Sequence, residues 1–388
     1  MHIAFEFVCW GIAVAWCCRV LDAAWHMPRV PDLLADEFDR LPAGMPGITV
    51  IVPARDEVAD IGATLRSLLK QDYANVQIIA VNDRSTDETG PVMEKIARGH
   101  EDVLRIIHVR ELPEGWLGKT HAMALAARQA TTEWLLFTDG DVTFAPDALR
   151  RTLVHAQATG AEHMVTMPTM MVTRWDEGMV LGFFQVISIW AARPWRVNRA
   201  KSGRDCVGIG AFNMIRRDVY TKIGGFETLR MEVLEDVRLA RIVNDGGHVQ
   251  KVAFGRDLVR VHWAVGALGL VRVLTKNIFS AFRFRPTLLL LGCVWMAMFC
   301  VWPAVELLYA PTRVPGMIAL LAVAGGYAVY AKRSGISPGY VWLFPSAALL
   351  FIYTMLRSMR RTLKAGGVIW RGTFYKLDEL KKSAGRTW

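Results

Sequence analysis

Long apolar stretches at the two ends of the chain constrain its fold more than any other feature of the sequence. Residues 3–21 are apolar apart from Glu6 and Arg19, long enough for one membrane-spanning helix, and lack a small-residue cleavage site. Three further apolar stretches lie near the other end, at 287–310, 314–331 and 339–356. Together they raise the hydrophobic content to 53%, which is more than a soluble domain needs. We therefore expect a transmembrane anchor at 1–25 and transmembrane helices at 287–358.

The stretch between these ends, 45–260, has the alternating pattern of one soluble α/β domain. Strand-like apolar runs occur at 48–52, 76–81, 104–109 and 134–137, and helical patterns such as 61–69 and 120–129 lie between them. This alternation predicts a mainly parallel sheet with helices on both faces. In such a sheet ligands bind beyond the carboxyl ends of the strands, so polar residues at those ends are candidate site residues.

Carboxylates follow three of these strands at the point where each strand ends. The segments are PARDE at 53–57, NDRSTD at 82–87 and TDGD at 138–141. Helix capping explains either of the first two alone, and a solvated turn explains the third. Two carboxylates separated by Gly140, a residue that allows a tight bend between them, can also turn oxygen ligands toward one point, which suits Mg2+ or Mn2+ holding a diphosphate. Three such strand ends in one chain favour a nucleotide site at this edge of the sheet.

At these residues the chain resembles family 2 glycosyltransferases, which are inverting enzymes with a nucleotide-diphospho-sugar-binding domain. The motifs that carry the resemblance are IVPARDE (51–57), VNDRSTDET (81–89), GKTHA (118–122), FTDGDVTF (137–144), GAFNMIRR (210–217), GGFE (224–227) and LEDVRLARIV (234–243). The membrane segments and the terminal VIWRGTFYK (368–376) are similar to those of membrane-anchored members that act on hopanoids, carotenoids and, more distantly, ceramide. The implied fold is a Rossmann-like domain of the glycosyltransferase A type.

The resemblance also implies roles for individual residues. The implied donor-binding residues are Pro53, Glu57, Asp83, Lys119 and Asp139. Glu57 and Asp83 would bind the nucleoside of a UDP-sugar, with Asp83 accepting from the uracil N–H, and Asp139 would lie near the ribose and sugar. Asp141 would coordinate the divalent metal. Lys119 would lie near the nucleotide; its other interpretation is an exposed lysine at a helix start, where the helix dipole disfavours a cation.

Asp236, in the sequence Leu-Glu-Asp-Val at 234–237, matches the carboxylate that serves the family as general base. Direct inversion at the anomeric carbon needs such a group, because the acceptor hydroxyl loses its proton as it attacks. The alternative is an acidic pair at a helix start, with Arg238 and Arg241 forming surface salt bridges worth less than about 1 kcal/mol.

The acceptor is expected to contact a methionine-rich and aromatic stretch at 161–206, although such stretches also form ordinary core. Its cations favour lipid head groups over nucleic acid in a chain with spanning segments; they are Arg193, Arg196, Arg199, Lys201 and Arg204. The segment 261–286 has the pattern of an amphipathic helix lying in the membrane interface, or of a linker helix packed on the domain.

The tail at 359–388 is basic, which predicts a cytoplasmic location for it and for the catalytic domain. Three spans after the domain would place the tail outside. Either one segment is re-entrant or interfacial, for which Pro345 makes 339–356 a candidate, or the tail is exported despite its charge; we favour two full crossings. The tryptophans expected at the membrane interface are Trp10, Trp16 and Trp25.

These features predict a metal-dependent inverting glycosyltransferase of the inner membrane that moves a sugar from a UDP-sugar to a lipid or isoprenoid acceptor. The alternatives are a polyprenyl-phosphate glycosyltransferase and a non-catalytic nucleotide-binding membrane scaffold. No nucleic-acid partner is expected. The six cysteines show neither a disulfide framework nor a zinc-site spacing.

Overall fold

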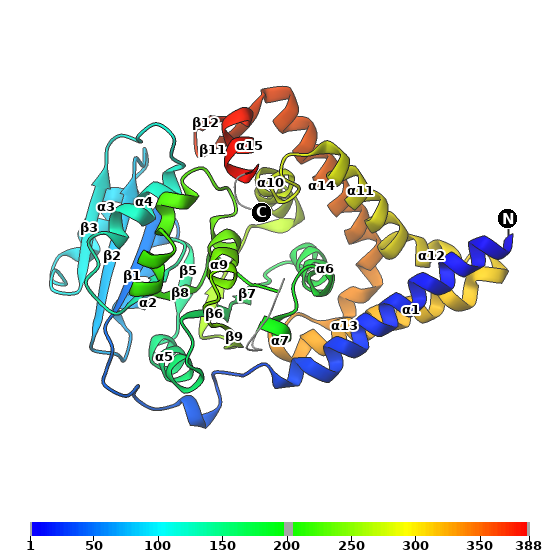
Figure 1. Cartoon of the computed structure of the whole chain (residues 1–388), viewed down its shortest axis with the longest axis horizontal. Coiled ribbons are helices and arrows are strands. Elements are labelled where there is room, and N and C mark those ends of the chain that lie inside the picture. The colour runs from blue at the N-terminus through cyan, green and yellow to red at the C-terminus, as the bar shows by residue number, and fades with distance from the viewer. Residues whose placement is uncertain (1, 198–204, 386–388) are drawn as a thin grey trace.

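A seven-stranded mixed sheet forms the centre of the domain in the computed structural model, which describes residues 2–197 and 205–385 (Figure 1). Its strands, in spatial order, are β3 (Leu104–Val109), β2 (Val76–Asp83), β1 (Ile48–Ala54), β4 (Trp134–Phe137), β8 (Asn213–Arg216), β6 (His163–Met167) and β9 (Gln250–Phe254). Only β8 runs antiparallel to its neighbours in this sheet. A small second sheet joins β5 (Val142–Phe144), β10 (Val259–Val261) and β7 (Thr169–Met170). The predicted α/β class with a mainly parallel sheet is confirmed.

Helices cover both faces of the large sheet. Their bounds are α2 (Ile61–Leu69), α3 (Thr89–Ala97), α4 (Gly118–Ala127), α5 (Ala148–Thr159), α8 (Arg217–Lys222) and α9 (Glu235–Asp245). Val50 packs in the core that contains α2, α3 and α5, whereas the next residue, Ile51, packs in the core that contains α4, α8 and α9. This alternation follows from the two-residue period of a strand, and it explains why β1 is apolar throughout.

Strands β1 and β2 run two residues further than the sequence pattern predicts. Pro53 lies within β1, opposite Val81, although a proline is usually excluded from central strands. The neighbouring strand β4 ends at Phe137, opposite Ile51, so no ladder on that side needs an N–H from Pro53. The extension carries the ends of β1 and β2 directly into the acidic segments.

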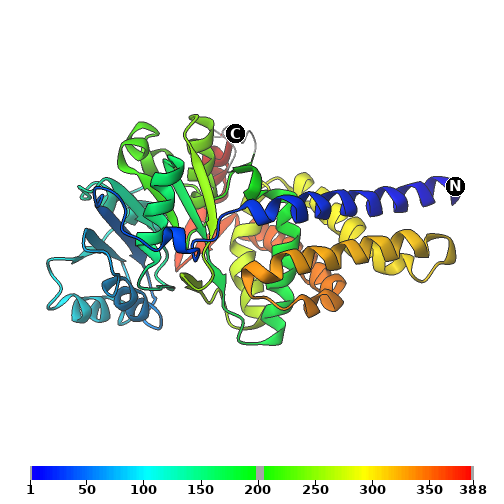
Figure 2. The ribbon, with the colours of Figure 1, turned by 90° about the horizontal axis from the view of Figure 1, so that it is seen from below.

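Among the described residues, four helices are long and apolar enough to cross a membrane, at Ala4–Arg29, Pro286–Glu306, Ala310–Ser334 and Pro338–Ala365. The corresponding elements are α1 (His2–His26), α11 (Pro286–Met296) joined through a π-helical turn (Ala297–Val301) to α12 (Trp302–Glu306), α13 (Arg313–Ser334) and α14 (Phe344–Ala365). Helices α1, α12 and α13 project away from the sheet in both views (Figures 1 and 2).

The interfacial role predicted for Trp16 is wrong. Its side chain is completely buried among the helices, and its indole Nε1 donates to the carbonyl of Phe299 at 2.8 Å. Trp10 and Trp25 are 43% and 69% exposed, as interfacial residues would be.

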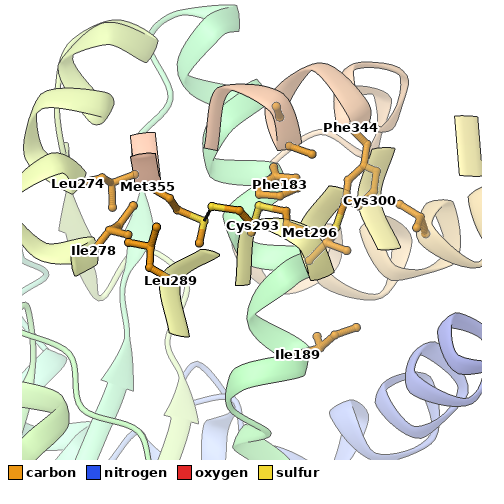
Figure 3. Close-up of a cluster of buried hydrophobic side chains, with 14 of the residues drawn as sticks. Phe183, Ile189, Leu274, Ile278, Leu289, Cys293, Met296, Cys300, Phe344 and Met355 are labelled. Carbon is orange, nitrogen blue, oxygen red and sulfur yellow. Dashed lines mark hydrogen bonds between the residues drawn. The ribbon is translucent and has the colours of Figure 1, made fainter. Parts of the chain in front are cut away.

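Helices α6 (Trp175–Ala191), α7 (Pro194–Val197) and α10 (Gly266–Ala281) lie between the sheet and the apolar helices (Figure 1). Figure 3 shows the buried cluster that joins them, with Phe183 and Ile189 of α6, Leu274 and Ile278 of α10, Leu289, Cys293 and Met296 of α11, Cys300, and Phe344 and Met355 of α14. Much of the predicted acceptor stretch is therefore core, because Met164, Phe183 and Ile189 are all buried, whereas Met171 is exposed.

The end of the chain folds back to the domain instead of forming a loose tail. Helix α14 continues to Ala365, so the predicted boundary at 358 falls inside a helix. A hairpin of β11 (Gly367–Trp370) and β12 (Thr373–Lys376) follows, and then α15 (Leu377–Gly385). The hairpin lies near α10 and α14 on one side and near the carboxyl ends of the strands on the other (Figure 1).

Candidate active site

The carboxyl ends of β2, β1 and β4 lie side by side, because these strands are neighbours in the sheet and all run parallel. Asp83 is the last residue of β2, Glu57 follows β1, and Asp139 and Asp141 lie between β4 and β5. The three acidic segments therefore meet at one edge. Asp56 links two of them directly, since its carboxylate accepts from the N–H of Thr86 at 2.8 Å.

Lys119, the second residue of α4, holds two carboxylates at this edge. Its Nζ lies 2.5 Å from Asp139 Oδ1 and 2.5 Å from Oε1 of Glu235, the first residue of α9. Burial raises the pKa of the Asp139 carboxyl, but the Lys119 charge outweighs it and holds this pKa below its usual value. Lys119 is thus a partly buried ion-pair partner, 20% exposed, and not the exposed lysine of the alternative interpretation.

Glu235 was not predicted as a site residue, although it precedes Asp236 in the motif. Its side chain is buried, and its ion pair with Lys119 replaces the surface salt bridges considered for this acidic pair. Arg241 instead pairs with Asp245 at the other end of α9. The sequence signal that could have identified Glu235 is a second carboxylate in a segment that matches a catalytic motif.

Asp236 lies beside this ion-pair network in a small pocket. The lining residues are Lys119, Met123, Phe137, Thr138, Gly210, Asn213, Phe226, Glu235 and Asp236. Burial, followed by the nearby Glu235 charge, raises the pKa of Asp236 to about 7. Its carboxylate accepts from the N–H of Val237 at 2.8 Å, an adjacent backbone group, so the side chain has no cation bound directly to it among the described contacts.

Two glycines of the segment before β8 let this chain approach the site closely. A Cβ on Gly208 would lie 2.0 Å from the carbonyl oxygen of Asp236, and a Cβ on Gly210 would lie 2.5 Å from Oδ2 of Asp139. Residues with side chains at either position would displace a carboxylate of the site. The GAFN motif is therefore explained by the space that Gly210 leaves for Asp139.

Asp83 is buried and accepts from both Nε and Nη2 of Arg84, at 2.8 and 2.9 Å. The first residue of α4, Gly118, packs directly on this carboxylate, because a Cβ there would lie 2.2 Å from Asp83 Oδ2. The GKTHA motif thus supplies both the glycine that fits against Asp83 and Lys119, which pairs with Asp139.

Asp141 has a buried carboxylate oxygen, Oδ1, with no hydrogen-bond partner among the described residues. Burial, followed by the charges of Asp139 and Glu57, raises its pKa to about 7. Both features fit a carboxylate that could hold a cation. The described residues contain no group of three His, Cys, Asp or Glu side chains placed to hold a metal ion.

Gly140 is not required by the bend between these two carboxylates. It does not have a positive φ, and a Cβ there would meet its nearest neighbours, Ala54 and Pro53, at 3.5 Å, an ordinary contact. The tight-bend argument for this glycine is therefore wrong.

The C-terminal hairpin supplies residues of the site that sequence reasoning missed. Arg371 forms an ion pair with Glu57, Arg55 donates to Thr373 at 3.0 Å, and the N–H of Gly118 donates to the Tyr375 hydroxyl at 3.2 Å. The VIWRGTFYK motif was a sequence signal for these residues, but the local sequence pattern does not predict which part of the fold the motif contacts.

The cations predicted to face lipid head groups divide into two sets. Arg199, Lys201 and Arg204 lie outside the described residues. Arg193 forms a two-pronged pair with Asp205, at 2.8 Å for each contact, and is thereby neutralised within the protein. This leaves Arg196 of the predicted set among the described residues, and its Nε is buried.

Comparison with known proteins gives matches over the domain and beyond it. Residues 49–224 match the family model described as Glycosyl transferase family 2. The 4,4'-diaponeurosporenoate glycosyltransferase of Staphylococcus aureus strain USA300 is 24% identical over 342 residues, which cover 86% of this chain and 89% of that protein. The protein of the same name from strain MRSA252 is 23% identical over the same shares of the two chains.

Two solved structures show more distant similarity. The mannosyltransferase PcManGT from Pyrobaculum calidifontis, in complex with GDP-Man and Mn2+, covers 92% of this chain and 98% of its own at 18% identity and a TM-score of 0.49. S. aureus TarS 1–349 in complex with UDP-GlcNAc covers 84% and 95% at 15% identity and a TM-score of 0.43.

Proposed function

We propose, from the premise that this chain carries a glycosyl transferase family 2 domain at residues 49–224, that it transfers a sugar from a UDP-sugar to a lipid or isoprenoid acceptor with inversion. One observation carries the proposal, namely that Lys119 pairs with both Asp139 and Glu235, the neighbour of Asp236. A single cation thus joins Asp139, which is expected at the sugar, to the residue adjacent to Asp236, which is expected at the acceptor. Direct displacement needs this proximity of donor and base.

Asp236 is the proposed general base. The acceptor oxygen forms a bond to the anomeric carbon as the bond from that carbon to the diphosphate breaks, UDP leaves with the electron pair, and the hydroxyl proton passes to Asp236. A base works best when its pKa lies near the working pH, and burial raises the pKa of Asp236 to about 7.

Asp141 is the residue that we propose to hold a divalent cation, Mg2+ or Mn2+. Its partnerless buried oxygen fits this role, and a single carboxylate is enough when substrate phosphates and water complete the coordination. The cation would neutralise charge on the leaving diphosphate. Electron paramagnetic resonance of Mn2+ titrated into protein and UDP tests this assignment, with at least about tenfold weaker binding expected for Asp141→Asn. Unchanged Mn2+ binding would show that Asp141 is not the ligand.

The acceptor class is supported by the position of the apolar helices and by one relative. Helix α10 packs against α6 and α14. Its Lys276 lies close enough to Asp139 and Glu235 for their charges to raise its pKa, against the effect of burial. This position of α10 supports an acceptor that approaches the site from the bilayer side. The S. aureus relative is named for 4,4'-diaponeurosporenoate, and we extend an isoprenoid-type acceptor to this chain as a proposal.

Replacing Asp236 tests the reaction and separates the two acceptor classes. With purified protein, UDP-sugars and lipid extract, Asp236→Asn should lower UDP release about 100-fold or more, because a positioned base contributes about that factor. Asp245→Asn is the matched control, since Asp245 is exposed at the other end of the same helix. Near-normal turnover by Asp236→Asn would point to an acceptor whose oxygen is already ionised, such as a polyprenyl phosphate or a carboxylate, and would refute the hydroxyl acceptor.

The membrane topology that we propose has two crossings after the domain, one by α11–α12 and one by α13. The contacts of the C-terminal hairpin with Glu57 and Gly118 support it, because they require the tail and the domain to lie on one side, which is the cytoplasmic side for a basic tail. Helix α14, which packs along α10, would then lie in the interface.

Cysteine labelling tests this topology in a background without the six native cysteines. An impermeant maleimide applied to intact cells should label Leu308→Cys, which lies in the exposed turn between α12 and α13, but not Asp378→Cys in the tail. Labelling of Asp378→Cys from outside would refute the two-crossing arrangement.

A further inference from the structure

The turn of the C-terminal hairpin holds an arginine that local turn chemistry does not favour. Trp370 pairs with Thr373, so Arg371 and Gly372 form a two-residue turn, with φ of 45° and 75°. Two positive φ values are typical of a type I′ turn, whose first position favours Asn, Asp or Gly. The conformation of the turn therefore does not explain why an arginine occupies this position.

Three contacts hold this hairpin against the edge of the sheet where the acidic segments meet. Arg371 pairs with Glu57, and the two flanking contacts, Arg55 with Thr373 and Gly118 with Tyr375, attach both the turn and β12 to segments of the candidate site. Arg371 nevertheless leaves 39% of its side chain exposed. Its guanidinium has five N–H donors, so it can bind a second anionic group while it contacts Glu57.

A second cation, Lys276 of α10, lies beside the same turn. Its Nζ lies 3.6 Å from the centre of the Trp370 ring. Burial lowers the pKa of Lys276 to about 8. The charge of Glu235 raises this pKa, whereas the charges of Lys119 and Arg371 lower it further. Lys276 thus lies close enough to both Lys119 and Arg371 to be repelled by their charges. An anion bound among them would relieve that repulsion.

We propose that Arg371, assisted by Lys276, binds the diphosphate of the sugar donor, so that the C-terminal hairpin forms part of the donor site. This inference rests on the proposed function, and it adds to the site two residues that lie outside the region matched by the family. The guanidinium fork suits this role because it matches two phosphate oxygens at once. The ion pair with Glu57 holds the fork beside the segment expected to bind the nucleoside.

The decisive comparison is between UDP and uridine, because only UDP carries the diphosphate. Arg371→Asn removes the cation but places a favoured residue in the turn, so the hairpin should keep its fold. We expect UDP binding by full-length protein with Mn2+, measured by titration calorimetry, to weaken at least tenfold. Uridine binding, measured by ligand-observed NMR, should change less than twofold.

Lys376→Gln is the matched control, because this substitution removes the same charge from the same hairpin. Lys376 is exposed, so its replacement should leave UDP affinity unchanged. Arg371→Lys should recover part of the UDP affinity. Unchanged UDP binding by Arg371→Asn would overturn the inference. Equal loss of UDP and uridine would overturn it as well, because the hairpin would then only support the shape of the site.

Failure of the donor assignment would be visible separately. If the wild-type protein binds GDP in place of UDP, the proposed donor is wrong, and the same comparison with GDP and guanosine decides whether Arg371 binds the diphosphate. If the wild-type protein binds neither diphosphate, both the donor proposal and this inference are overturned.

Discussion

Gly208→Ala should disable catalysis although it replaces none of the proposed catalytic side chains. The new Cβ would lie 2.0 Å from the carbonyl oxygen of Asp236 and 2.7 Å from the nitrogen of Val237, which are backbone atoms of α9 and cannot rotate away. The first distance is about 1.4 Å short of the 3.4 Å at which ordinary contact begins. The start of α9 must therefore move by about 1 Å, together with the Asp236 carboxylate.

A displacement of about 1 Å in a positioned group typically costs about 100-fold in rate, so we expect kcat for UDP release to fall by about that factor. UDP affinity should stay within about twofold, because Glu57 and Asp83 belong to other elements, and this binding shows that the domain remains folded. Gly11→Ala is the control for the exchange itself, since a Cβ there meets no atom within 4 Å. A Gly208→Ala protein with kcat within threefold of wild type would refute the argument that α9 positions the base.

Three further outcomes are expected. The rate kcat/KM should fall about tenfold for each pH unit below about 7, because the base acts only when Asp236 is deprotonated and its pKa is raised to about 7; a flat profile between pH 5 and 7 would contradict this. Lys119→Met should lower the free energy of unfolding by about 1–2 kcal/mol, because Glu235 is buried and would remain without a counter-charge, whereas water screens the more exposed Asp139; an unchanged melting temperature in detergent would contradict it. Trp16→Phe should cost about 1 kcal/mol in the same measurement, because a buried carbonyl loses its indole donor, whereas Trp25→Phe at an exposed position should cost little.

The sequence predicts the parts of this molecule that depend on local pattern. The apolar runs at 104–109 and 134–137 are strands with those bounds, and the helix at 61–69 is present as predicted. Residues 49–224 match the model of the glycosyltransferase family that the motifs resemble. Element ends are predicted less well, as at Pro53, where the strand continues because its neighbour has already ended. Hydropathy alone also misplaced Trp16, since it carries no information on which helix face meets another helix.

The candidate site shows the same division. The motifs contain Glu57, Asp83 and Lys119, and the sheet order brings their segments to one edge. The roles of Asp236 and Asp141 remain predictions. The pairing of Arg371 with Glu57 joins residues 314 positions apart, and no periodicity or spacing in the sequence encodes a contact of that kind. Long-range pairing is decided by how the apolar helices return the chain to the sheet.

The packing of α1 against α13 has a consequence for how the protein is made. The indole of Trp16 finds its acceptor in a segment 283 residues later in the chain. At a synthesis rate of about 5–20 residues per second, this separation corresponds to roughly 15 to 60 s between synthesis of the first helix and synthesis of its partner segment. During that interval the buried face of the helix lacks the contacts that it makes in the folded protein, so the helix bundle can assemble only late in synthesis.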